Sequence, residues 1–313
     1  MELAQALRRL QADNTSGAMA LVEEALHILE AFVSQQPAEC AAWREAWADL
    51  LGALVAAQPS MALMLNLAQQ VLQVSMHPET RHREQIQESL QAFRQELHTS
   101  LQRLCQQALA IFPAQATVLS YSNSATVIAV LGYAQAQQRV RRVLVSESRP
   151  ACDGRQQAVA LLQQGIQVEY SVDMALCARL PEADLVLVGA DAVFPEGLVN
   201  KLGTQTLAQL ARLQQVPFYS VCTAHKFLPQ AARPLWRLVE QPAAEVWPQA
   251  PAGLRIHNAY FDITPLRLCS GVVHEEGVAT PATLERLLQQ RELSPGLQQL
   301  LARQGQEGAK SRG

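Results

Sequence analysis

The chain has 313 residues, of which 49% are hydrophobic and 17% are charged, and its formal net charge is −3. This composition is typical of a globular protein with a large apolar core, and it excludes a strongly basic nucleic-acid-binding protein and a polybasic membrane anchor. The length predicts one large domain or two.

Residues 1–112 show the periodicity of helices. In "GAMALVEEALHILEAFVSQQ" and in the long polar stretch that ends at "LCQQALAIF", apolar residues recur three and four positions apart. "PAECAAWREAWADLLGALVAA" begins with Pro37, which suits the first turn of a helix. The most apolar stretch is interrupted at Gln58-Pro59 and is too short to span a membrane. We therefore predict a helical domain over residues 1–112.

The pattern changes after Pro113, where short apolar runs begin to alternate with helical stretches. The runs are "ATVLSY", "RVLVSE", "IQVEYSV", "DLVLVGA" and "PFYSVC". Strands that are apolar on both faces and alternate with helices predict a parallel sheet covered on both sides. We therefore predict an α/β domain over residues 113–293, followed by a polar, partly disordered tail over residues 294–313.

The sequence also predicts what the protein lacks. Its start has no apolar leader, and its six cysteines are scattered without a CxxC pair or a His/Cys cluster, which favours a cytoplasmic protein with reduced thiols and no metal. GxGxxG and GxxxxGK[ST] are both absent, so no dinucleotide site, no P-loop and no cofactor are predicted.

Ligands of parallel sheets bind beyond the carboxyl ends of the strands, so the polar residues found there are candidate site residues. The first strand ends in Ser122, Asn123 and Ser124. These side chains suit the cap of the following helix, and they equally suit a ligand at the amino end of that helix. From this stretch alone, capping is the favoured interpretation.

The second and fifth strands supply basic candidates. Arg149 and Arg155 flank the turn after the second strand, where they either belong to a solvated loop or hold a phosphate. His225 and Lys226 follow the fifth strand, either on a surface loop or at the edge of the same crevice.

The fourth strand is the most informative. Asp191 follows a fully apolar strand, and Asn200 and Lys201 stand at the expected start of the next helix. A lysine at the amino end of a helix opposes the helix dipole, so an anionic ligand is expected beside it. The alternative is an aspartate turn followed by a surface lysine.

Four segments together resemble one superfamily. They are "SESRPACDGR", "VGADAVFPEGLVNKLGT", "PFYSVCTAHKF" and "FDITPLRLCSGVVHEEGVATP". The superfamily contains the alpha, beta and delta subunits of translation initiation factor 2B, methylthioribose-1-phosphate isomerase and ribose-1,5-bisphosphate isomerase. The resemblance implies an N-terminal helical domain followed by a Rossmann-like domain, and homodimers or larger assemblies.

The resemblance also implies residue roles. In the isomerases, a cysteine after the first strand and an aspartate after the fourth move protons on a ring-opened sugar phosphate. That aspartate corresponds to Asp191, and other family positions correspond to Arg149, Asn200, Lys201 and Lys226.

Three positions depart from the isomerase pattern. Ser122 stands where the isomerases have the cysteine, and serine cannot supply a thiolate. Ser16 and Gln58 stand where the family has arginines that hold phosphate. Each lost charge-assisted contact is worth about 1.5–3 kcal/mol.

Two functions remain open at this point. The first is a sugar-phosphate isomerase with Asp191 and Ser122 as catalytic residues. Its ligand would be a phosphorylated sugar or nucleotide, held by Asn123, Ser124, Arg149, Arg155, Asn200, Lys201 and Lys226. The second is a non-catalytic regulatory or assembly protein of the initiation-factor-2B type. Neither of these two functions predicts a nucleic-acid or membrane partner.

Overall fold

The computed structural model describes residues 3–13, 17–35, 41–75, 82–233 and 238–299. Pro37 and Ser16 lie outside these ranges, as does most of the predicted tail. In the described part of the chain, no helix combines the length and the apolar character needed to cross a membrane.

The N-terminal part is helical, as predicted. Its apolar periodicities form five helices that share one core, and this core includes the stacked rings of Trp43 and Trp47. The helices are α1 (Leu3–Ala12), α2 (Ala18–Gln35), α3 (Ala41–Ala57), α4 (Ala62–Ser75) and α5 (His82–Ala108).

The C-terminal part is built on a mostly parallel sheet of seven strands in the order β10-β9-β7-β4-β1-β2-β3, which confirms the α/β class. Only β10 runs antiparallel to its neighbour. The strands are β1 (Ala116–Ser120), β2 (Val140–Ser146), β3 (Val168–Ser171), β4 (Leu185–Val188), β7 (Phe218–Val221), β9 (Gly271–His274) and β10 (Gly277–Ala279).

Helices cover both faces of this sheet, which is why its central strands are apolar on both sides. One face packs against the end of α5, α6 (Ala125–Ala136) and α7 (Gly154–Gln163). The other packs against α8 (Asp173–Ala178), α9 (Thr204–Leu213) and α10 (Pro281–Gln289).

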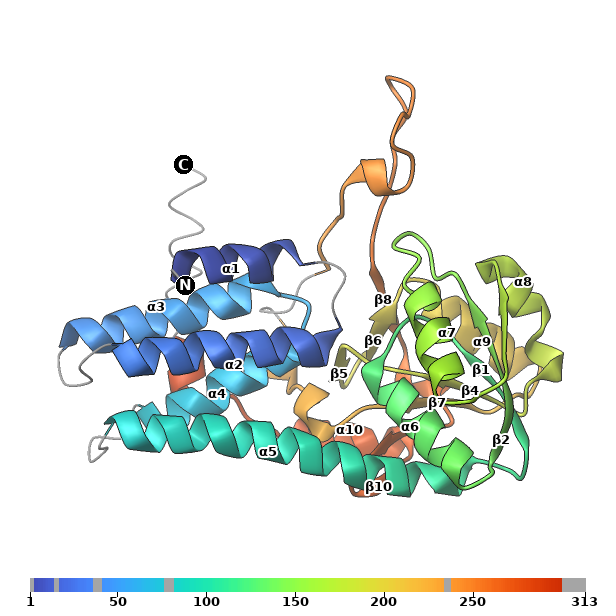
Figure 1. The fold of residues 1–313 in the computed structure, drawn as a ribbon, viewed down its shortest axis with the longest axis horizontal. Helices are drawn as coiled ribbons and strands as arrows, with labels where there is room; N and C mark the ends of the chain where they lie inside the picture. Colours follow the sequence, from blue (N-terminus) through green and yellow to red (C-terminus); the bar gives the residue numbers. More distant parts are fainter. Residues whose placement is uncertain (1–2, 14–16, 36–40, 76–81, 234–237, 300–313) are drawn as a thin grey trace.

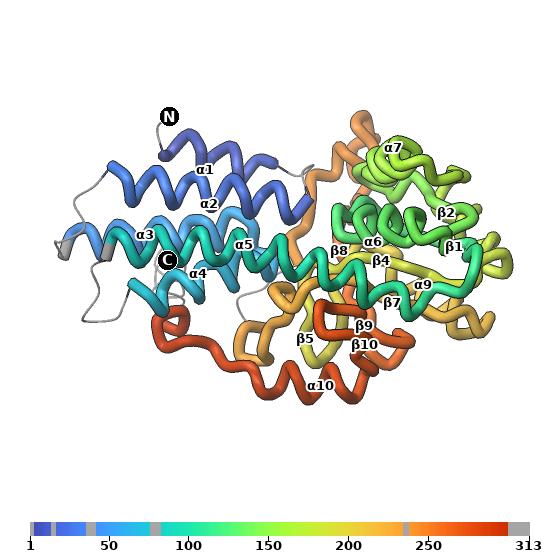
Figure 2. The backbone as a smooth tube through the Cα atoms, turned by 60° about the horizontal axis from the view of Figure 1, so that its bottom comes forward, coloured from blue at the N-terminus to red at the C-terminus, as the bar shows by residue number. Residues whose placement is uncertain are grey.

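Helix α5 belongs to both halves of the molecule. Ile86, Leu90 and Phe93 lie in the core of the helical bundle, whereas Leu104 and Ala108 lie in the core beneath the sheet. Figures 1 and 2 show this helix running along the two halves. The domain boundary at residue 112 stays a prediction. Packing is continuous between the two halves, because α5 contributes side chains to both cores.

A small antiparallel sheet, of order β5-β6-β8, lies between the two halves. Its strands are β5 (Ala192–Phe194), β6 (Gly197–Lys201) and β8 (Phe261–Thr264). The prediction that Asn200 and Lys201 start a helix was wrong, because they end strand β6 and α9 begins only at Thr204. Pairing of β6 with β5 and β8 overrides the helical pattern of this segment.

Residues 240–259 form an arm that the sequence did not predict. An isolated bridge between Glu240 and Ala259 closes its base, and Figure 1 shows it standing away from the body of the molecule. Val246, Trp247 and Leu254 are exposed along it.

Candidate functional site

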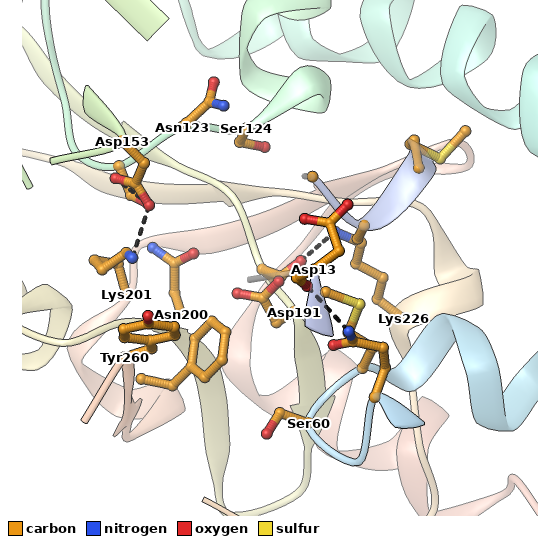
Figure 3. A pocket seen from close by; sticks show the side chains of 18 of the residues that line it. Asp13, Ser60, Asn123, Ser124, Asp153, Asp191, Asn200, Lys201, Lys226 and Tyr260 are labelled. Atoms are coloured by element: carbon orange, nitrogen blue, oxygen red, sulfur yellow. Dashed lines mark hydrogen bonds and ion pairs between the residues drawn. The ribbon is translucent and has the colours of Figure 1, made fainter. Parts of the chain in front are cut away.

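A cavity of about 350 Å³ lies where the helical half meets the carboxyl ends of the sheet strands. Residues of the α1–α2 and α3–α4 connections form one wall, and residues that follow β1, β2 and β4 form the other. Figure 3 shows polar side chains from both parts turned toward this space.

The strand order explains why the cavity lies here. Strands β1 and β4 are neighbours, but the chain continues from β1 to β2 on one side and from β4 to β7 on the other. At such a switch point, the connections leave in opposite directions and open a crevice at the strand ends. Ser122 follows β1 and Asp191 follows β4, so the two predicted catalytic positions line the same cavity.

Asp191 is half-buried in the cavity wall, and its backbone ties the two halves together. Its carbonyl accepts a hydrogen bond from the backbone N–H of Ala62, the first residue of α4. Burial raises the pKa of its carboxyl, while Lys226 and Lys201 act in the opposite direction. A carboxyl group whose pKa is raised suits a general acid or base.

The raised pKa of Asp191 has a consequence for stability. Because the folded-state pKa exceeds the unfolded one, the stability that this group contributes is complete below the unfolded pKa and is lost as pH rises through the folded pKa. Asp191→Asn mimics the protonated form, so the ligand-free variant should melt above the wild type at neutral pH. The difference should vanish near pH 4 and below. Melting curves across pH 4–8 test this, and a constant difference would contradict it.

Two lysines enter the cavity wall from different elements. Lys226 is buried, and its ammonium group donates to the carbonyl of Ala190. Lys201 is also buried, forms an ion pair with Asp153 at 2.7 Å and lies 5.1 Å from the centre of the Tyr260 ring. Beside Lys201, Asn200 donates its amide to Thr204.

The segment after β1 has two roles. Ser124 caps α6 by accepting the N–H of Val127, which confirms the capping interpretation for this residue, and it also lines the cavity. Asn123 lines the cavity and donates its amide to Gln156. Ser122 has a φ of 71°, a left-handed conformation that is costly for a residue other than glycine.

The cavity wall contains the amino ends of four helices. The lining residues of this kind are Gly17 and Ala18 at α2, Met61 before α4, Ser124 and Ala125 at α6, and Asp153 before α7. The helix dipole makes such ends favourable for anions. The two lysines and these helix ends supply positive potential in a wall that also holds Asp13, Asp153 and Asp191.

The structure does not bring every predicted residue to the cavity. Arg149 is exposed and donates to the Val246 carbonyl of the arm, and Arg155 is exposed on α7. His225 lies in a second cavity, where its ring contacts Phe93 and its Nε2 lies 3.7 Å from Glu96. His225 is therefore not positioned to act as a base for Ser122.

Sequence reasoning missed Asp13, Asp153 and Tyr260, all of which line the cavity. The sequence gives only a weak indication that Asp153 belongs to the site, because an aspartate before a helix is normally interpreted as its N-cap. Its side chain caps nothing and pairs with Lys201 instead. Among the described residues, no three His, Cys, Asp or Glu side chains gather as a metal ion would require.

Gln58, which stands where the resemblance implies an arginine, has a structural role here. Its amide donates to the carbonyls of Leu10 and Asp13 at 2.7 and 3.1 Å, near the end of α1. Those carbonyls lie in the last turn of α1 or just beyond it, where a side-chain donor can take the place of a helical one.

Gln58→Leu should therefore lower the free energy of unfolding by about 1 kcal/mol, because the two hydrogen bonds from this side chain are lost. Chemical denaturation measures the change. Gln106→Leu, at an exposed position of α5, is the control and should leave stability nearly unchanged. Equal effects of the two substitutions would contradict the assignment.

Comparison with known proteins agrees with the residue resemblance. The model of the Initiation factor 2 subunit family matches residues 14–281. A translation initiation factor eIF-2B subunit 2-like protein from Pyrococcus furiosus is 30% identical over 224 residues, which are 71% of this chain and 77% of that protein. Ribose 1,5-bisphosphate isomerase from Methanocaldococcus jannaschii is 33% identical over 53% of this chain and 55% of its own length.

Methylthioribose-1-phosphate isomerase from Pelotomaculum thermopropionicum is 33% identical over 64% of this chain, and the match spans 60% of that enzyme. The matches therefore span little more than half of these two isomerases. Among solved structures, the eIF-2B of Pyrococcus horikoshii superimposes with a TM-score of 0.79 at 24% identity, covering 92% of this chain and 98% of that one. The chain belongs to the Initiation factor 2 subunit family.

Proposed function

We propose that the cavity binds a phosphorylated sugar and that the protein interconverts its aldose and ketose forms. The observation that carries this proposal is the half-buried Asp191, whose raised pKa suits proton transfer and which faces a cavity bordered by two lysines and four helix amino ends. Relatives that are named as isomerases of sugar phosphates support the same substrate class.

The roles follow from position. Asp191 moves a proton between the two carbons of the ring-opened sugar, and Lys226 beside it stabilises the negative charge that develops on the sugar oxygens. Ser122 and Asn123 contact substrate hydroxyls, and the helix ends with Lys201 hold the phosphate. Arg149 and Arg155 have no part in this scheme, because the structure keeps them outside the cavity wall.

A thermal-shift screen tests binding. Ribose 1,5-bisphosphate, methylthioribose 1-phosphate, hexose phosphates and nucleoside monophosphates are each added to the purified protein. A ligand at one hundred times its dissociation constant adds about 2.7 kcal/mol to stability, which is readily detected. Each hit is then assayed for turnover. No shift with any of these compounds would contradict the proposal.

A second candidate function is regulation through assembly without turnover, and Ser122 in place of the isomerase cysteine favours it. Exposed apolar side chains support an interface between copies of the chain. They lie on α7, on the edge strand β3, and on α8 and the residue before it: Val159, Leu162, Tyr170, Val172 and Met174. One solved structure with this fold is a tetrameric eIF2B complex.

Sedimentation velocity with and without the best ligand tests this candidate. Assembly without measurable turnover would favour the regulatory function over the isomerase. A monomer at every protein concentration, with or without the ligand, would rule it out.

A further inference from the structure

Asp153 joins the residue that replaces the family cysteine to one of the cavity lysines. Both carboxylate oxygens of Asp153 lie 3.4 Å from the Ser122 hydroxyl oxygen, and one lies 2.7 Å from the Lys201 ammonium nitrogen. All three residues line the cavity. Figure 3 shows Asp153 and Lys201 facing each other across its edge.

The surrounding structure holds this group in place. The Ser122 backbone N–H donates to the Ser148 hydroxyl, which fixes the left-handed turn that carries the side chain. Lys201 is 5% exposed, and the Tyr260 ring lies beneath its ammonium group. Tyr260 is fixed in turn by donating its hydroxyl to Glu245 in the arm.

This arrangement places a base beside the Ser122 hydroxyl. A serine hydroxyl moves protons poorly unless a base lies beside it. Asp153 is such a base, because its ion pair with Lys201 engages one carboxylate oxygen while both oxygens lie 3.4 Å from the Ser122 hydroxyl.

We propose that Asp153, paired with Lys201, is the positioning residue that lets Ser122 carry out the proton transfer that the isomerases assign to cysteine. The inference rests on the proposed isomerase function. As a substrate hydroxyl gives its proton to the Ser122 oxygen, the original Ser122 proton passes to Asp153. One substrate O–H bond breaks, the Ser122 hydroxyl is restored, and one O–H bond forms on Asp153. The reverse transfer returns the proton to the neighbouring substrate oxygen.

Kinetics of four proteins test the coupling: wild type, Ser122→Ala, Asp153→Asn and the double variant. Asp153→Asn should lower kcat about 10²-fold in the wild-type background. In the Ser122→Ala background it should change kcat less than about threefold, because the relay is already broken. Asp153→Glu keeps the carboxylate and should recover part of the lost activity. Equal losses in both backgrounds would show a merely structural role and overturn the proposal.

A second measurement does not depend on turnover. In Ser122→Cys, the introduced thiol is titrated by the ultraviolet absorbance of its thiolate, with the wild type as the blank. Adding Asp153→Asn should lower the pKa of that thiol by about one unit, because a neighbouring negative charge is removed. Asp184 precedes β4 and lies outside the cavity wall. Adding Asp184→Asn should therefore leave the pKa of the introduced thiol unchanged. An unchanged pKa with Asp153→Asn overturns the proposal.

The two failures are distinguishable. If the wild type converts no sugar phosphate, the proposed function falls and the relay falls with it, whatever the thiol titration shows. If the wild type is active but Asp153→Asn keeps full activity, the relay alone falls.

Discussion

Asp191→Asn is expected to lower the turnover number for the best sugar phosphate by a factor of about 10²–10⁴, because the variant cannot accept or return a proton. Asparagine keeps the size of the side chain and its place between β4 and β5. Ligand affinity should therefore survive, or increase, since a carboxylate that repels phosphate is removed. Steady-state kinetics and thermal shifts of the same preparation separate the two effects.

Asp184→Asn is the matched control for this experiment. Asp184 precedes strand β4 and Asp191 follows it, so the two substitutions change the same residue type at opposite ends of one strand. Asp184 is exposed and accepts the backbone N–H of Thr117, far from the cavity wall. Its replacement should leave turnover within about threefold of the wild type. Full activity of Asp191→Asn would exclude the proposed acid-base role.

Gly154→Ala should lower the free energy of unfolding by about 3 kcal/mol or more. Gly154 is the first residue of α7, and a Cβ atom there would overlap the backbone carbonyl oxygen of Ser146 at the end of β2. Neither strand nor helix can shift freely, because both are packed in the core beneath the sheet. Denaturant titration gives the change, and a loss below about 1 kcal/mol would contradict this account.

Gly132→Ala provides the comparison. A Cβ atom at this position of α6 would meet the end of the Gln164 side chain, which is exposed and can rotate away. Alanine also favours a helix over glycine by about 1 kcal/mol. This variant should therefore be as stable as the wild type or more stable. Comparing the stabilities of Gly154→Ala and Gly132→Ala therefore distinguishes the effect of a clash with the backbone from that of a clash with a flexible side chain.

Much of the architecture could be predicted because local patterns decide it. Apolar spacing revealed the bundle helices, and doubly apolar runs revealed β1, β2, β3, β4 and β7. Strand β6 could not be found in this way. Its partners are the short β5, which directly precedes it, and β8, which lies some 60 residues later in the chain, so part of the pairing that makes it a strand depends on a distant segment.

The site was predictable to the same extent. Asp191, Ser122 and Lys226 could be predicted to lie together, and they line one cavity, because parallel strands bring their carboxyl ends to one edge; their roles stay predictions. Arg149 could not be assigned correctly, since its direction depends on the arm that it contacts. Asp153 was missed because its partner Lys201 lies 48 positions later, and no local pattern indicates that ion pair.

The long helix α5 also bears on how the molecule loses its structure. One end of this helix is embedded among the bundle helices and the other beneath the sheet, so neither half can melt without exposing apolar surface of the other. We expect a single cooperative transition on heating. In hydrogen exchange, amides of α5 should be the last to exchange in both halves, and their protection should be uniform along the helix. A ligand held in the cavity would then slow exchange at both ends of the molecule together.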